Sequence, residues 1–210
     1  SFLTEKVGFL EMADVVAHLI DGANDYGLSV RRALKGSIAP PLGYRSLSAN
    51  ERTDQLMALR TAFDEDLFPE FYASCLRLNQ LLVGLTPEQH SLPVWHSSAP
   101  LAVSELIELR VVELAVHAWD VRYGIDRSVA LSPTALPFLR GYLGRWLERA
   151  FHRPQGLEEP VKFRFLLTDA DEGSGLVVTR DSFDLRSSDS EAADVTFTCD
   201  TSSFLLLTMG

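Results

Sequence analysis

The sequence predicts an α+β protein in which a helical bundle is followed by a small, strand-rich unit. Apolar side chains recur with helical spacing through the first part of the chain, where at least four long helical segments fit. After residue 155, short stretches alternate apolar and polar residues between turns that contain Asp, Glu, Gly and Ser, as strands do. We therefore expect a bundle domain over residues 1–155 and a smaller domain over residues 156–210.

Composition and charge narrow the class of protein. A chain of 210 residues can bury a real core. A formal net charge of −10, without a clustered basic patch, argues against nucleic acid or an anionic membrane as a partner. Two cysteines without a C-x-x-C motif suit a reducing compartment. With no signal-peptide pattern and no long apolar run, we expect a cytoplasmic protein. Because the chain starts at Ser1, we also expect trimmed ends.

The first helix is expected over residues 5–35, with Val15 and Leu19 on its apolar side. His18 lies among these positions, where a lone histidine is more often a satisfied core residue than a metal ligand. Asp14, one turn earlier, is either a first-turn carboxylate that the helix N-terminus stabilises or a partner that orients the His18 ring.

A second helical region follows a connector rich in Gly, Pro and Ser, residues 36–47. Ser48 and Glu51 have the spacing of a capping box and open a helix that can run to about residue 85. We expect a bend or break near Pro69.

Residues 86–103 are expected to form a loop that leads into the next helix. Trp95 lies in this polar loop just before a charged interior, so its ring is expected to wall a pocket. His96 beside it is a candidate further ligand or general base.

The next helix, residues 109–124, carries four ionisable side chains in one narrow arc: Arg110, Glu113, His117 and Asp120. Apolar residues border the arc on both sides, and a helix that is apolar nearly all round is normally buried. Since ionic groups stay in an interior only when they are paired or bound to a metal, this ionic stripe is expected to be one or the other.

Both interpretations of the ionic stripe are open at this point. In an ion-pair ladder, Arg110 holds Glu113 and Asp120 holds His117, each pair three residues apart. In a metal site, Glu113 and His117 lie one above the other, about 5–6 Å apart at Cβ, which suits two ligands of one divalent cation. A third ligand elsewhere would favour the metal.

The remaining elements are a helix and several strands. A helix is expected from Pro133, with Ser132 as its N-cap, to near His152. The stretches that alternate as strands are residues 161–170, 175–188 and 193–200. A last helix begins with Thr201 or Ser202 as its cap. Because about 55 residues are few for an independent core, we expect this unit to pack against the bundle or to continue beyond the sequence.

Two segments resemble the signatures of the DinB-like, mycothiol-dependent maleylpyruvate isomerase family: residues 10–20 (LEMADVVAHLI) and 110–124 (RVVELAVHAWDVRYG). The Trp95 loop and residues 193–210 (ADVTFTCDTSSFLLLTMG) resemble that family's loop and its small, sterol-carrier-like α/β domain. The most specific feature is D-x-x-x-H followed, about a hundred residues later, by R-x-x-E-x-x-x-H-x-x-D.

The resemblance implies a four-helix bundle in which His18, Glu113 and His117 hold a zinc ion. Similar proteins bind the thiolate of mycothiol at the open zinc position, and the thiol then adds to an electrophilic substrate, giving isomerisation or S-transfer. The chemistry fits, because zinc stabilises a thiolate at neutral pH and three protein ligands leave an exchangeable fourth position.

Roles for the neighbouring residues follow from this picture. Arg110, Asp120 and His96 are the candidate catalytic residues. Trp95 and Arg110 are the candidate contacts to the thiol cofactor, with a surface of polar acceptors around residues 21–25 as further lining. Asp14 and Asp120 are expected to support the ligand histidines without binding metal.

The sequence also departs from the family pattern. Phe9 lies where a tryptophan often precedes the first signature, position 96 is His instead of a small residue, and the chain ends before an arginine and further β structure that the family typically has. Two other functions therefore stay open. One is a zinc hydrolase of a small amide or ester with His96 or Asp120 as base, and the other is a non-catalytic protein that holds an apolar ligand in its β-rich unit and a structural metal. A di-iron bundle is disfavoured, since E-x-x-x-H occurs once.

Overall fold

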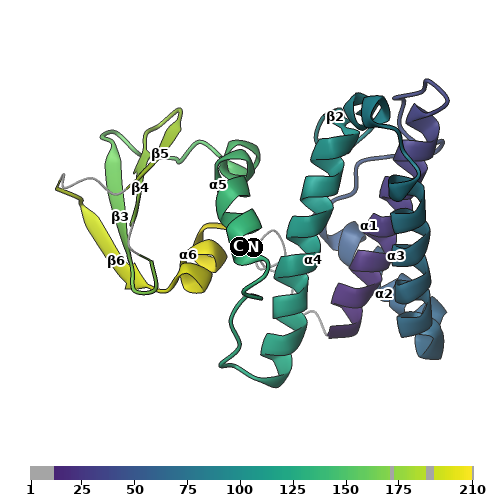
Figure 1. The fold of residues 1–210 in the computed structure, drawn as a ribbon, viewed down its shortest axis with the longest axis horizontal. Helices are drawn as coiled ribbons and strands as arrows, with labels where there is room; N and C mark the ends of the chain where they lie inside the picture. The colour runs from purple at the N-terminus through teal and green to yellow at the C-terminus, as the bar shows by residue number, and fades with distance from the viewer. Residues whose placement is uncertain (1–11, 171–172, 188–191, 210) are drawn as a thin grey trace. The chain divides into compact units, whose positions relative to one another are not determined.

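The computed structural model describes residues 12–170, 173–187 and 192–209, and it confirms the predicted α+β class (Figure 1). The described residues form two compact units, which divide between Arg127 and Ser128. No helix among the described residues is both long and apolar enough to cross a membrane. The part of the predicted first helix before Met12 lies outside the described residues.

The first unit is built on four long helices and two short strands. The helices are α1 (Met12–Ala33), α2 (Ala49–Phe63), α3 (Leu67–Val83) and α4 (Val103–Ile125), and the strands are β1 (Pro93–Val94) and β2 (Leu101–Ala102). Helix α1 contacts the other three helices. Its buried residues Val16, Ala17 and Ile20 pack with Leu67 of α3. This central place of α1 brings its polar side chains toward α4.

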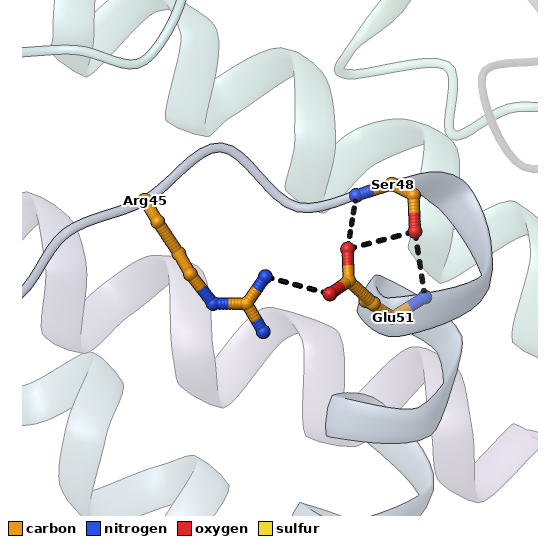
Figure 2. Close-up of polar contacts among 3 residues, drawn as sticks. All are labelled: Arg45, Ser48 and Glu51. Atoms are coloured by element: carbon orange, nitrogen blue, oxygen red, sulfur yellow. Dashed lines mark hydrogen bonds and ion pairs between the residues drawn. The ribbon is translucent and has the colours of Figure 1, made fainter.

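The predicted capping box at the start of α2 is confirmed (Figure 2). The Ser48 backbone N–H donates to the Glu51 carboxylate (2.8 Å), and the Glu51 N–H donates to the Ser48 hydroxyl (3.3 Å). Arg45 donates to the other carboxylate oxygen (2.6 Å). The Ser48 N–H, the Arg45 guanidinium and the Ser48 hydroxyl lower the pKa of Glu51 to about 2. Three residues thus satisfy the helix start locally.

The predicted break near Pro69 was misplaced. The helical region is interrupted by a 3-10 turn, η1 (Asp64–Asp66), and Asp64 adopts a positive φ of 42°. Pro69 lies in the first turn of α3, where a missing backbone N–H costs no intrahelical hydrogen bond.

The second unit is a four-stranded sheet with two helices. The elements are α5 (Leu136–Ala150), β3 (Val161–Leu167), β4 (Ser174–Val178), β5 (Phe183–Ser187), β6 (Val195–Cys199) and α6 (Thr201–Met209). The strand order is β5-β4-β3-β6, with β3 and β6 parallel and the other neighbours antiparallel. Phe165 of β3 packs on Phe204 of α6, with ring centroids 4.7 Å apart. Residues 175–188, which the sequence pattern marks as one strand-like stretch, contain most of β4 and all of β5.

Two sequence-based details of this unit, both helix caps, differ from the structure. Helix α5 begins at Leu136, because residues 132–135 form a turn and Ser132 is not the cap. The cap of α6 is Asp200, whose carboxylate accepts the Ser203 N–H (2.7 Å), and not Thr201 or Ser202. Helix α5 packs on α6, so it belongs to the unit that contains the sheet. The division into compact units does not test the domain boundary expected at residue 155, which stays a prediction.

Candidate functional site

The ionic stripe of α4 contains both ion pairs of the predicted ladder. Arg110 contacts Glu113 (3.4 Å), and His117 contacts Asp120 (2.7 Å). Arg110 and His117 are 5% and 8% exposed, whereas the side chains of Glu113 and Asp120 are 27% and 35% exposed. The two basic groups are thus buried, and each acidic partner reaches toward solvent.

Arg110 is anchored from two other helices. One guanidinium nitrogen donates to the Leu19 carbonyl of α1 (2.9 Å) and lies 3.6 Å from the Cys75 thiol of α3. The other donates to Glu113. Gly22 of α1 faces this pair, since a Cβ there would lie 3.4 Å from the guanidinium and 3.6 Å from the carboxylate. Gly22 thus places the backbone of α1 directly against the ion pair, with a Cβ at that position in ordinary van der Waals contact with it.

Glu113 has hydrogen bonds on both carboxylate oxygens. The hydroxyl of Tyr26, a buried residue of α1, donates to Oε1 (3.1 Å), and Arg110 donates to Oε2. These contacts come from two helices, and together they fix the direction in which the carboxylate points. Sequence reasoning missed Tyr26 and Gly22, although both follow His18 at intervals of four residues and so lie near its face of α1.

His18 of α1 and His117 of α4 meet edge to face. Their ring centroids are 5.2 Å apart and their planes make an angle of 81°. Since a carboxylate only accepts, the contact with Asp120 makes Nδ1 of His117 the protonated nitrogen and leaves the Nε2 lone pair for another partner. Burial lowers the pKa of His18, Glu113 opposes this, and His117 adds to it. Burial therefore favours the neutral, metal-binding form of His18.

The other predicted neighbours of His18 lie along α1. Asp14 is buried and pairs with Arg60 of α2 (3.3 Å), so its expected support of the His18 ring stays a prediction. Further along, burial raises the pKa of Asp21. Burial and the charge of Asp21 raise the pKa of Asp25 to about 6, against the effect of Arg52.

The loop between β1 and β2 brings the two predicted aromatic side chains to different partners. Trp95 packs edge-on against Tyr44 of the connector, with centroids 4.5 Å apart. The His96 ring lies 6.2 Å from the ring of Tyr26. Nδ1 of His96 accepts the Ser98 N–H (3.3 Å), which leaves the proton of a neutral ring on Nε2. Tyr26 thus contacts both residues, with its ring near His96 and its hydroxyl on Glu113.

Within the described ranges, no three His, Cys, Asp or Glu side chains are arranged so that they could hold a metal ion. The two imidazoles are in contact, but Glu113 is engaged by Tyr26 and Arg110. A metal held by all three predicted ligands would require the carboxylate to turn from at least one of these partners.

Two comparisons with known proteins bear on this site. The family model described as the mycothiol maleylpyruvate isomerase N-terminal domain matches residues 11–122, which include every residue of the ionic stripe and His18. A crystal structure of the mycothiol-dependent maleylpyruvate isomerase has a similar fold, with a TM-score of 0.62 and 15% sequence identity. The match covers 97% of this chain and 76% of that one. No curated protein matches the chain.

Proposed function

The chain belongs to the mycothiol maleylpyruvate isomerase N-terminal domain family, and from this premise we propose that it is a zinc-dependent enzyme. In this proposal it uses a low-molecular-weight thiol, mycothiol, for isomerisation or S-transfer on a small electrophilic substrate. The observation that carries the proposal is the contact of His18 with His117, one turn after Glu113 on α4.

The donor set suits zinc. His18 and His117 would supply two neutral imidazoles and Glu113 a carboxylate, which is a set found in catalytic zinc sites and leaves one position open. The contact with Asp120 orients the His117 ring, so Nε2 would be the atom that binds the metal. The low pKa of His18 spares the loss of a proton on binding. When bound, zinc would lower the pKa of a thiol at the open position.

The other side chains have supporting roles in this proposal. Arg110 and Asp120, first considered as catalytic, act as positioning residues, because their contacts are with Glu113 and His117. The His96 ring lies 6.2 Å from that of Tyr26 and outside the ligand set, and its Nε2–H is the candidate to donate a proton to the substrate. Trp95, packed on Tyr44, is the candidate wall for the thiol cofactor.

A hydrolase would need an unengaged base beside the open position. Its two candidates already have partners, since Asp120 accepts from His117 and Nδ1 of His96 accepts from Ser98. These contacts favour thiol chemistry over the activation of water.

Metal analysis tests the first half of the proposal. Protein purified without chelator is expected to carry one zinc ion per chain, and His18→Ala and His117→Ala are expected to lose it. His152→Ala removes an exposed histidine and is the matched control. Absence of any divalent metal, or its retention in both ligand variants, would overturn the assignment.

A thiol titration of cobalt-substituted protein tests the second half. Mycothiol is expected to change the visible cobalt spectrum and to leave metal-free protein unaffected, because the thiolate enters the open position. An unchanged spectrum at saturating thiol, together with hydrolysis of simple esters or amides, would establish the hydrolase instead.

A further inference from the structure

The register of the sheet gathers three cations on one face. Phe165 of β3 packs on α6, so its neighbour Arg164 points to the opposite face, together with Lys162. Arg164 pairs with Gly175 of β4, and Gly175 pairs in turn with Arg186 of β5. Directly paired residues share a face, so the two arginines flank a glycine in one row across three strands. We call Lys162, Arg164 and Arg186 the basic face.

A small hollow lies on the basic face. It has a volume of about 40 Å³, and its lining includes all three cations and Gly175. A side chain at position 175 would extend from the middle of this row, and glycine leaves that space open. Since one water molecule needs about 10–15 Å³ of cavity volume, the hollow has room for a few waters or one small anion.

Two carboxylates and one unsatisfied donor lie near the hollow in the part of the chain that the structure describes. Asp184 pairs with Arg186 (2.6 Å), and Asp194 accepts the backbone N–H of Lys162 (2.8 Å). The Nη2 atom of Arg164 is buried and makes no hydrogen bond to any described residue. A buried guanidinium N–H without an acceptor is costly, so this atom is expected to have one.

We propose that the basic face binds a small oxyanion, namely the carboxylate or phosphate group of a small molecule, with Arg164 as its main donor. Guanidinium groups match both anions, because two parallel N–H donors fit two oxygens. The small volume selects a single such group and excludes a nucleic acid backbone, which the net charge of −10 also disfavours. The proposal does not depend on the zinc site.

The test is an NMR titration of the full, ¹⁵N-labelled chain, followed through the arginine side-chain Nε–H signals. Inorganic phosphate and acetate are added in separate arms, and sodium chloride keeps the ionic strength constant. A saturable shift of the Arg164 signal with either anion supports the site, and the arm with the lower Kd identifies the group. Shifts that stay linear in both arms overturn the proposal.

Variants locate the binding. Arg164→Gln is expected to raise the Kd roughly tenfold, because a charge-assisted hydrogen bond is lost. Arg180→Gln removes an exposed charge from the turn after β4 and is expected to leave the Kd unchanged. An equal Kd in Arg164→Gln and the parent overturns the proposal. If Arg164→Gln does not fold, Arg186→Gln takes its place, with the same two outcomes read on the remaining arginine signals.

Discussion

The ionic stripe of α4 and the basic face of the sheet differ in how they accommodate buried guanidinium nitrogen atoms. Arg110 has an acidic partner three residues along its own helix and a carbonyl from α1. Arg164 lies beside two further cations, and its buried Nη2 has no hydrogen bond to a described residue. The helix compensates its charges internally, whereas the sheet leaves a donor unsatisfied among the described residues. We infer that the first arrangement supports a metal site and the second attracts an anion.

The largest expected effect tests this contrast through stability. Arg110→Met leaves Glu113 without its cation and the Leu19 carbonyl without its donor, and is expected to cost about 3 kcal/mol of unfolding free energy. Arg164→Met removes a donor that has no acceptor, and is expected to change stability by less than about 1 kcal/mol, in either direction. Urea unfolding of both variants measures the difference.

Arg77→Met is the control for this pair of variants. Arg77 forms an exposed ion pair with Glu70, and such pairs are worth about 0–1 kcal/mol. The contrast between the two regions would fail if Arg164→Met cost as much as Arg110→Met, because Arg164 would then have a partner as good as Glu113.

The second effect concerns the acidic end of the ionic stripe. Asp120→Asn keeps the shape of the side chain but weakens the hydrogen bond that orients His117. The zinc affinity is expected to fall about 10–100-fold, the usual scale for groups that orient a metal ligand. Competition with a chromophoric chelator measures it. If the affinity stays the same, the Asp120–His117 contact is an ordinary ion pair and the ladder interpretation is sufficient.

A smaller loss is expected from the other side of the site. Tyr26→Phe removes the hydroxyl that donates to Glu113, and the carboxylate keeps only its contact with Arg110. We expect the zinc affinity to fall by up to about tenfold, at the lower end of the range for such partners. Tyr72→Phe, at an exposed tyrosine of α3, is the control. Tighter zinc binding in Tyr26→Phe would mean that the hydroxyl competes with the metal for Glu113.

The ionic stripe and the capping box could be predicted from the sequence, because both depend on the spacing of residues within one helix. Arg110 and Glu113, like Ser48 and Glu51, are three residues apart, and helix geometry alone brings such pairs together. The resemblance supplied His18, which the structure places against His117. The ligand set itself stays a prediction.

Long-range contacts were out of reach of the sequence. Tyr26 meets Glu113 only through the packing of α1 on α4. The three cations of the basic face are spread over residues 162–186 and look dispersed until the register of β3, β4 and β5 aligns them. The break at Asp64 depends on an unusual positive φ of a residue other than glycine, which no local rule predicts.

A further prediction concerns Asp184, the acidic residue that pairs with Arg186 of the basic face. Asp184→Asn releases Arg186 from its carboxylate and makes the hollow more positive. Because both groups are well exposed, we expect a modest effect, with phosphate binding about threefold tighter. Asp181→Asn, which breaks an exposed pair with Arg153, is the matched control. Weaker binding in Asp184→Asn would show that Asp184 holds Arg186 in the orientation that the anion needs.

The smallest expected effect concerns Asp21 and Asp25 of α1, two neighbouring carboxylates of like charge within the bundle. Asp21 and Asp25 lie one turn apart on α1, and burial together with the charge of Asp21 raises the pKa of Asp25 to about 6. In the unfolded chain this carboxyl ionises near its ordinary pKa of 3.8, so between about pH 4 and pH 6 the folded state binds more protons. Ionisation of Asp25 therefore lowers the free energy of unfolding as the pH rises through this window. Asp25→Asn is expected to raise the unfolding free energy by about 0.5 kcal/mol at pH 7, the scale of a like-charge pair on a helix, and by nothing near pH 3.5. Thermal unfolding at the two pH values measures this, with the exposed Asp54→Asn as the control. A loss of stability in Asp25→Asn at pH 7 would mean that Arg52 compensates the charge of Asp25 as fully as Arg110 compensates that of Glu113. The carboxylates of α1 would then be balanced internally, like those of α4.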